Sequence, residues 1–267
     1  MLANIASFSV PKRGSAQEEC EDSTWVGPDG LGAGEFDINR LRIVVADGAS
    51  ESLLAGRWAR RLTSTFGTGK SSTRAKPNFI ATYNTAVDEW AKEMDEYEVE
   101  REERGSPIQW YEEPGLAKGA HSTVVVVEIF DGKQGIPPFW RAAAIGDSCV
   151  FQVRNEELVA SFPIQEEEAF SFSPSLLSSR GGENDVIRRH IGLTGGAWDH
   201  EDSFYIVTDA LAAWFLRIAR NGGHPWEPLR DMNTVDFDLD FESWVNAQRD
   251  AGDMHDDDTT LVRVDLY

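Results

Sequence analysis

The chain has 267 residues, 41% hydrophobic and 10% aromatic, which is enough for one large or two small domains with a hydrophobic core. Its net charge of −21 and pI near 4.5 argue against nucleic acid or an anionic membrane as a partner. No apolar run approaches the roughly 18 residues of a membrane span, the first residues lack the basic start of a signal peptide, and the two cysteines fit a reducing cytoplasm.

The first third of the chain predicts strands followed by a helix pair. Short strands are expected at residues 6–10 and 24–26, and the apolar run 41–46 predicts a buried strand that ends in Asp-Gly. Apolar residues at every fourth position predict a helix over residues 54–66. A second amphipathic helix is expected over residues 77–97, with its aromatic side chains in the core.

The middle of the chain predicts strands that follow a polar segment. Residues 98–119 contain two prolines and are expected to form an exposed loop, while the acidic run 88–113 is typical of a solvated helix face. Strands are expected at residues 122–130 and 139–145. The polar turn within residues 149–162 predicts a hairpin of two strands, 149–153 and 158–162.

The last third combines an irregular segment with strands and helices. Residues 163–202 have weak periodicity and are expected to be a variable flap or insert. A strand over 203–207, a helix over 211–218, one or two helices within 225–252 and a final strand over 260–266 follow. Strands without regular β-α-β alternation favour an α+β fold with antiparallel sheets covered by helices, and no linker or repeat divides the chain, so a single domain over 1–267 is expected.

Aspartates stand where several hydrophobic strands end. They are Asp47, Asp147, Asp209 and the run Asp256-Asp257-Asp258, and Glu21-Asp22 adds an acidic pair near the start of the chain. One such aspartate alone is typical of turn chemistry. Several carboxylates brought together need a cation to neutralise them, and hard oxygen ligands without Cys or His favour Mg²⁺ or Mn²⁺ over zinc. The set therefore predicts a shared metal site.

Six short motifs span essentially the whole chain: Glu21-Asp22, Asp47-Gly48, Ser122-Thr123, Gly146-Asp147-Ser148, Thr208-Asp209 and Asp257-Asp258-Thr259-Thr260. In this order, they resemble those of the metal-dependent type 2C serine/threonine protein phosphatases, most closely their divergent bacterial-type branch. The resemblance implies a four-layer α-β-β-α sandwich with two central antiparallel sheets and a metal centre at one end of them.

The resemblance also implies the roles of the acidic residues. Two Mg²⁺ or Mn²⁺ ions would be held by Glu21, Asp47, the Gly48 carbonyl, Asp209 and Asp257, with Asp47 bridging them. Asp147 would support a third, looser ion, and Asp22 would orient ligands through hydrogen bonds. Asp47, Asp209 and Asp257 would then act in catalysis through metal-bound water: a bridging hydroxide attacks the phosphorus of phosphoserine or phosphothreonine.

The chain departs from the family pattern around the substrate phosphate. Many members carry an arginine a few residues before the acidic pair, where this chain has Gln17, Glu18 and Glu19. Either Lys12 or Arg13 reaches in from a longer loop, or phosphate binding relies on metal alone, and Arg13 is the favoured residue. A histidine found in some relatives after the bridging aspartate is Ala49 here, and a glycine of the Thr-Asp motif is Ala210.

These features predict a cytoplasmic, metal-dependent phosphoprotein phosphatase that acts in signalling. Its expected partner is a phosphorylated protein, opposed by a cognate serine/threonine kinase, with no nucleic-acid or membrane partner. Two alternatives remain open. The chain is a pseudophosphatase that binds phosphorylated partners without hydrolysis, as the missing arginine suggests, or it hydrolyses a small phosphorylated metabolite.

Overall fold

The computed structural model describes residues 1–27, 30, 32–69, 72–133, 135–170, 174–182, 184–232 and 238–267. The strands in these ranges are β1 (Leu2–Val10), β2 (Ser23–Gly27), β3 (Gly34–Asp37), β4 (Arg40–Ala46), β5 (His121–Ser122), β6 (Val124–Phe130), β7 (Phe139–Ile145), β8 (Cys149–Arg154), β9 (Glu157–Phe162), β10 (Leu177–Ser178), β11 (Gly192–Ala197), β12 (Ser203–Val207) and β13 (Thr259–Leu266). The helices are α1 (Ala55–Thr68), α2 (Lys76–Glu103), α3 (Glu113–Lys118), α4 (Asn184–His190), α5 (Asp209–Arg220), α6 (Trp226–Arg230) and α7 (Asp238–Asp250), with short 3-10 helices η1 (Gln17–Glu19) and η2 (Glu167–Ala169).

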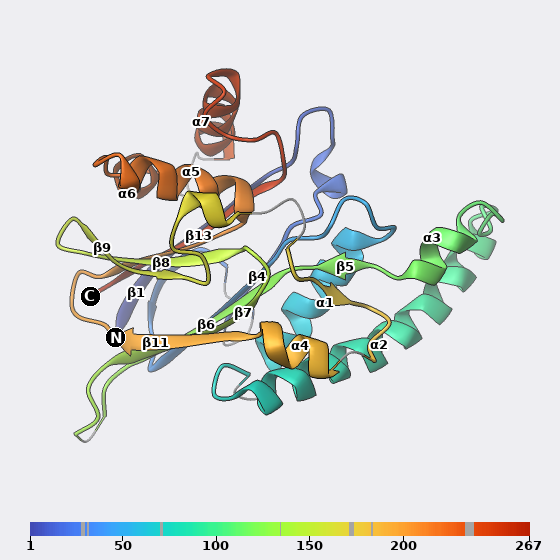
Figure 1. Cartoon of the computed structure of the whole chain (residues 1–267), viewed down its shortest axis with the longest axis horizontal. Coiled ribbons are helices and arrows are strands. Elements are labelled where there is room, and N and C mark those ends of the chain that lie inside the picture. Colours follow the sequence, from blue (N-terminus) through green and yellow to red (C-terminus); the bar gives the residue numbers. More distant parts are fainter. Residues whose placement is uncertain are drawn as a thin grey trace.

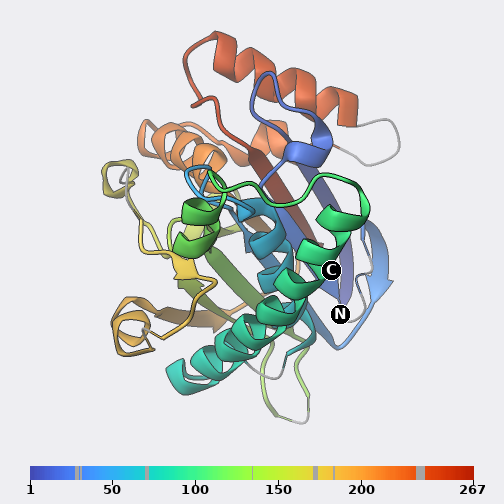
Figure 2. The same ribbon diagram turned by 90° about the vertical axis from the view of Figure 1, so that its right-hand side faces the viewer.

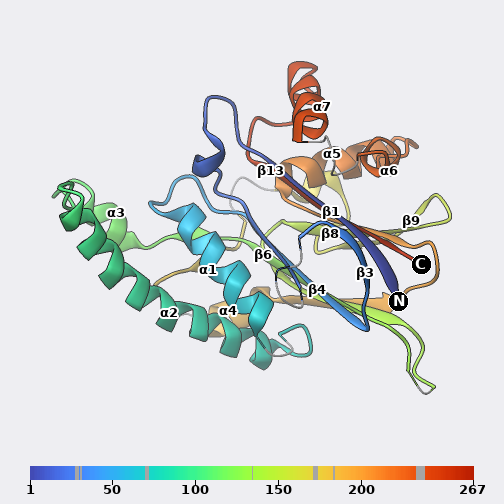
Figure 3. The ribbon, with the colours of Figure 1, turned by 180° about the vertical axis from the view of Figure 1, so that it is seen from behind.

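Most strands belong to two antiparallel sheets that lie face to face. One has six strands in the order β3-β1-β13-β12-β8-β9, and the other has five in the order β11-β7-β6-β4-β2. Helices α5, α6 and α7 cover the outer face of the six-stranded sheet, while α1, α2 and α4 cover that of the five-stranded sheet (Figure 1). Figure 3 shows the same layers from behind. The predicted α+β class and four-layer α-β-β-α sandwich are confirmed.

The continuous apolar runs of β4 and β6 follow from burial on both faces. Val45 and Val125 pack into the core between the two sheets. Their neighbours Val44 and Val126 point the opposite way and pack against α1 and α2. Because side chains alternate along a strand, one that is covered on both sides needs apolar residues throughout. The strands predicted at residues 41–46 and 122–130 are therefore central strands of the sandwich.

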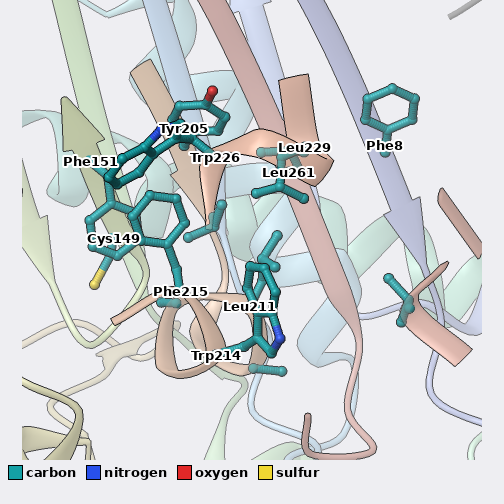
Figure 4. Close-up of a cluster of buried hydrophobic side chains, with 14 of the residues drawn as sticks. Phe8, Cys149, Phe151, Tyr205, Leu211, Trp214, Phe215, Trp226, Leu229 and Leu261 are labelled. Atoms are coloured by element: carbon teal, nitrogen blue, oxygen red, sulfur yellow. The ribbon is translucent and has the colours of Figure 1, made fainter. Parts of the chain in front are cut away.

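The outer core of the six-stranded sheet fixes the position of α5. In Figure 4, Phe151 and Tyr205 from the sheet face Leu211 and Phe215 of α5, with Trp226 of α6 beside them. The rings of Phe151 and Phe215 stack with their centroids 4.2 Å apart. The apolar spacing that predicts this helix thus forms its buried face. This packing also anchors the first residue of α5, a predicted metal ligand.

The region expected to be a loop over residues 98–119 contains helix at both ends, so that prediction is wrong there. Helix α2 continues past Tyr97 to Glu103, and α3 lies within the same segment. The added turn of α2 is held by polar contacts: the guanidinium of Arg101 lies 5.6 Å from the centroid of the Tyr97 ring and donates to Glu112. Hydrophobic periodicity does not detect a helix that is stabilised in this way.

Residues 163–202 contain more regular structure than their weak periodicity indicates. Strand β11 pairs with β7 as an edge strand of the five-stranded sheet, and α4 precedes it. The strand is glycine-rich; a Cβ on Gly195 would lie 2.6 Å from the carbonyl oxygen of Trp140. Such a strand has no apolar pattern to recognise. A flap role for this segment stays a prediction, and residues 171–173 and 183 lie outside the described ones.

Candidate metal centre

Five predicted site aspartates occupy turns at one edge of the sandwich. Asp22 precedes β2, Asp47 follows β4, Asp147 joins β7 to β8, Asp209 opens α5 after β12, and Asp257 precedes β13. In antiparallel sheets the end of one strand lies beside the start of its neighbour, so these turns gather on the same edge. We refer to these five residues as the carboxylate cluster.

The five-stranded sheet contributes Asp22 and Asp47. The register of β2 and β4 places these two residues opposite one another, just beyond the paired ends of the strands. Ser122 of β5 and the adjacent Thr123 hold the Asp47 carbonyl oxygen, which accepts hydrogen bonds from the Thr123 amide at 2.8 Å and the Ser122 hydroxyl at 2.7 Å. The Ser-Thr pair therefore fixes the backbone of Asp47.

The six-stranded sheet contributes Asp209 and Asp257, Asp147 lies in the turn that connects the two sheets, and hydrogen bonds join the sheets at this edge. The Thr208 hydroxyl donates to Oδ2 of the buried Asp22 at 3.0 Å and accepts from the Thr260 amide at 2.9 Å. Beside it, Asp209 lies at the first position of α5, where a helix terminus favours negative charge. Thr208, whose role sequence reasoning missed, thus connects Asp22 to the turn that carries Asp209.

Burial and mutual repulsion make the cluster electrostatically costly without a cation. Burial raises the pKa of Asp47 well above its usual range, and Asp22, Asp209, Asp257 and Asp147 raise it further. The pKa of Asp209 is raised to about 7, first by burial and then by Asp147 and Asp257. Burial raises the pKa of Asp147 to about 6 and also raises those of Asp22 and Asp257. The five carboxylates therefore form one interacting set.

The three consecutive aspartates before β13 have different partners. Both oxygens of Asp258 accept backbone amides, from Lys12 at 2.7 Å and Glu21 at 2.6 Å. Asp256 accepts the Arg13 amide at 3.1 Å and lies 3.6 Å from Arg249. The Asp257 carboxylate accepts only the following amide among the described residues. Asp257 is thus the member of the run whose carboxylate is most available to a ligand.

Gly48 and Glu21, which are predicted to hold the same ion, are neighbours. A Cβ on Gly48 would lie 2.9 Å from the Glu21 carbonyl oxygen and 2.8 Å from the backbone of Ala55, so only glycine fits between them. The Glu21 carboxylate accepts a hydrogen bond from the Ser50 hydroxyl at 2.5 Å. The tight backbone packing thus brings the loop after Asp47 against the acidic pair.

Lys12 and Arg13 point to different parts of the molecule. The ammonium of Lys12 lies 2.9 Å from the Glu21 carboxylate and 2.8 Å from the Ser50 hydroxyl. The guanidinium of Arg13 instead bonds to Asp250 of α7 at 2.5 Å. The structure therefore brings Lys12, rather than the favoured Arg13, to the acidic pair. The sequence identified both residues as candidates for binding the phosphate, but it does not specify which of them lies beside the acidic pair.

The donors of this edge fit a hard divalent cation. They are carboxylates and one backbone carbonyl, without Cys or His, and Oδ1 of the buried Asp22 has no hydrogen-bond partner among the described residues. No three cluster carboxylates of the described chain bring oxygens within 4.8 Å of one another. The group that meets this distance, Glu156-His224-Glu227, is exposed on the surface, and its Glu156 already accepts from Trp226.

Metal-free protein should lose stability as pH rises. A carboxyl group with a raised folded pKa contributes stability below its unfolded pKa near 4, and that stability is lost as pH rises through the folded value. Because the pKa of Asp147 is about 6 and that of Asp209 about 7, we expect the free energy of unfolding in EDTA to fall by about 2–4 kcal/mol between pH 5 and pH 8. Urea titrations at both pH values measure this. Asp209→Asn should reduce this fall in the free energy of unfolding with pH. A native protein of unchanged stability between pH 5 and pH 8 would contradict the prediction.

Comparisons with known proteins show which solved structures share this fold. No protein-family model and no curated protein sequence matches the chain. The serine/threonine phosphatase of S. agalactiae matches with a TM-score of 0.57 at 12% identity, over 99% of this chain and 100% of that one. RsbX in complex with magnesium gives 0.53 at 14% identity, over 100% and 96%. The catalytic domain of the serine/threonine phosphatase PstP with two manganese ions gives 0.52 at 14% identity, over 99% of each chain.

Proposed function

We propose that this chain, which has the fold of the metal-dependent type 2C protein phosphatases, hydrolyses phosphoserine and phosphothreonine in proteins with the help of Mg²⁺ or Mn²⁺. The observation that carries the proposal is the carboxylate cluster, in which burial of the carboxyl group and then four neighbouring carboxylates raise the pKa of the half-buried Asp47. A cluster of this kind is stable in its ionised form when cations neutralise it. The magnesium bound to RsbX and the two manganese ions bound to PstP support this choice of metal.

Each of the two ions would have two ligands of its own and share a third. Glu21 and the Gly48 carbonyl would bind one, Asp209 and Asp257 the other, and Asp47 both. When bound, such ions supply a water molecule of lowered pKa and neutralise charge on the phosphoryl oxygens. The surrounding structure keeps these ligands in place. Hydrogen bonds to its carbonyl oxygen fix the backbone of Asp47, and the packing of α5 fixes Asp209.

Asp147 and Asp22 have supporting roles in the proposal. Asp147 would help to hold a third, looser ion, and its charge raises the pKa of Asp209 more than that of any other neighbouring carboxylate, second only to burial. Asp22 would orient the ligands around Asp47 through its hydrogen bond with Thr208. Neither residue needs to donate or accept a proton in the reaction.

An open site supports a protein substrate over a small metabolite. Asp47, Asp209 and Asp257 are half-buried at the edge of the sandwich. A polar cavity of about 540 Å³ lies at the other end of β13, where Asp265 and Tyr267 help to line it, and it is separate from the cluster. Enclosed pockets are typical of small-molecule sites.

The pseudophosphatase alternative rests on the absence of an arginine at residues 17–19.

Hydrolysis of p-nitrophenyl phosphate tests the proposal. We expect turnover by purified protein with Mn²⁺ or Mg²⁺ and none after chelation, because the carboxylates cannot activate water alone. No turnover with either ion, together with metal binding in isothermal titration, would favour the pseudophosphatase. No metal binding at all would contradict the metal assignment itself.

Lys12 and Arg13 are the two candidates for binding the substrate phosphate. The role predicted for Arg13 stays a prediction; Lys12 is a second candidate because its ammonium lies beside Glu21 and is attracted by Asp258 and Asp257. We expect Lys12→Met to raise KM for p-nitrophenyl phosphate roughly tenfold, and Arg13→Met to leave it unchanged, as for loss of uniform binding. Steady-state kinetics of both variants decide the matter: the reverse result would assign the role to Arg13, and no effect in either would leave phosphate binding to the metal.

The proposal also includes a cytoplasmic location, a role in signalling and a cognate serine/threonine kinase. No helix within the described ranges has the length and apolar character to cross a membrane. The net charge of −21 disfavours nucleic acid as a partner. Phosphoproteome comparison of cells with and without the protein would identify the phosphorylated sites on which it acts.

A further inference from the structure

The segment between α2 and α3 presents two exposed aromatic rings. Trp110 is 79% exposed and Tyr111 65% exposed, and their rings meet edge to face with centroids 5.9 Å apart. Isolated apolar side chains are normal on a surface, but Trp and Tyr in a fixed pair are the residues that anchor protein interfaces most often. We refer to this pair as the aromatic pair.

The backbone of the aromatic pair is held in a defined turn. The Gln109 amide donates to the Glu112 carboxylate at 2.8 Å, and the Glu112 amide donates to the Gln109 carbonyl oxygen at 2.8 Å. Arg101 of α2 adds two hydrogen bonds to the Glu112 carboxylate, each 3.1 Å long. The rings are therefore displayed on an ordered turn, and a partner that buries them pays little entropy for ordering the backbone.

The turn lies at the end of the molecule that carries the carboxylate cluster. Figure 2 shows the segment from α2 to α3 in front, below η1 and beside the loop that follows β4. Gly115 of α3 lies against Leu53 of that loop, where an added Cβ would be 2.5 Å from Leu53 Cδ1. The chain then enters β5, whose His121 carbonyl accepts the Ala49 amide at 2.9 Å. A substrate seated on the turn would extend towards the cluster.

The surroundings of the aromatic pair are strongly acidic. Residues 88–118 carry eleven acidic and four basic side chains. Glu89, Glu93, Glu100 and Glu112 are engaged by arginines of α1 and α2. Among the exposed acidic side chains that make no ion pair with any described residue, Glu102, Glu103 and Glu113 flank the turn, whereas Asp88, Asp95, Glu96 and Glu98 lie further back along α2. The negative electrostatic potential of these carboxylates attracts cations and repels an acidic partner.

We propose that the aromatic pair and the unpaired carboxylates around it form a docking surface for the basic sequence that flanks the phosphorylated residue of a protein substrate. The inference rests on the proposed function and adds a substrate class to it. Lys and Arg side chains pair with the carboxylates and stack on the rings by cation–π contact, while the phosphate enters the carboxylate cluster. The surface also offsets the repulsion between the phosphate and the acidic protein.

Two phosphothreonine peptides test the docking surface, one with Lys and Arg on both sides of the phosphothreonine and one with Gln at those positions. We expect the doubly substituted Trp110→Ala/Tyr111→Ala variant to raise KM for the basic peptide roughly tenfold and to leave p-nitrophenyl phosphate kinetics unchanged. Tyr267→Ala, at the opposite end of β13, is the matched control and should change neither. Equal KM values for the variant and the native protein would overturn the proposal.

Charge neutralisation tests the electrostatic part independently. Glu102→Gln/Glu103→Gln/Glu113→Gln should remove most of the preference for the basic peptide and weaken its dependence on salt. The exposed residues Glu35, Glu157 and Glu201, changed together to Gln, are the control for net charge. The same loss in both triple variants would overturn a local docking surface.

Binding measurements separate this inference from the proposed function. If native protein hydrolyses no substrate, the proposed function fails, and fluorescence anisotropy of the labelled basic phosphopeptide still measures docking on the same variants. Sedimentation velocity addresses a different occupant: a native dimer that Trp110→Ala/Tyr111→Ala converts to monomer would assign the surface to a second copy of the chain and overturn the peptide proposal.

Discussion

Asp47→Asn is expected to abolish metal-dependent phosphatase turnover while the protein stays folded. Asp47 is the proposed ligand common to both ions, and four carboxylates of the cluster act on it. Its amide replacement keeps the shape and removes the charge that binds the cations, so kcat/KM for p-nitrophenyl phosphate with Mn²⁺ should fall at least about a thousandfold, roughly 4 kcal/mol of transition-state stabilisation.

The same substitution should have the opposite effect on stability without metal. Removing one of five repelling carboxylates relieves the electrostatic cost of the cluster, so metal-free Asp47→Asn should unfold at a higher temperature than native protein at pH 8. Thermal unfolding in EDTA and isothermal titration with Mn²⁺ measure the two effects separately. Asp256→Asn, in the loop before β13, is the matched control and should keep both turnover and Mn²⁺ binding. Native-like binding and rate in Asp47→Asn would remove this residue from the site.

Glu128→Gln is expected to destabilise the protein more than any single surface change. Glu128 is fully buried in β6, and the register places Arg42 and Arg141 on either side of it. Arg42 donates to it at 2.7 Å, Arg141 lies 2.9 Å away, and Arg40 and Thr73 also bond to it. Although burial opposes ionisation, the hydrogen bonds from Thr73, Arg42 and Arg40 prevail and lower its pKa to about 2.

The cost arises from the arginine that remains. Arg42 is 6% exposed and also donates to the carbonyl oxygens of Phe66 and Gly67 at the end of α1, so it cannot turn to water when its charge partner is lost. Leaving one member of a buried ion pair uncompensated costs about 3–5 kcal/mol. We expect that fall in the free energy of unfolding, measured by urea titration at pH 7.

A surface pair and a double substitution are the controls for Glu128. Glu100→Gln removes the partner of Arg57 at the surface and should cost under about 1 kcal/mol. Glu128→Met with Arg42→Met removes both buried charges and should recover much of the loss. The stability that Glu128 contributes is present above its unfolded pKa near 4.3 and is lost as pH falls towards 2. A cost below about 1 kcal/mol for Glu128→Gln would contradict a buried network.

Elements with a strong hydrophobic pattern could be predicted from sequence. The strands expected at residues 41–46 and 139–145 and the helix at 211–218 lie within β4, β7 and α5. In each case the side chains that set the pattern are the ones that are buried. The polar end of α2 and the glycine-rich β11 were missed because arginine contacts and backbone pairing stabilise them, and neither leaves an apolar period.

The sequence by itself determined that the aspartates of the candidate site stand at the ends of strands, because a buried strand and its terminal turn are written in adjacent residues. The resemblance in motif order supplied the fold. Only the tertiary structure decided which side chains meet across the site: the Thr208 hydroxyl on Asp22, Lys12 rather than Arg13 beside Glu21, and the arginines around Glu128. These contacts join residues far apart in the chain, and the register of neighbouring strands, which local patterns do not specify, brings them together.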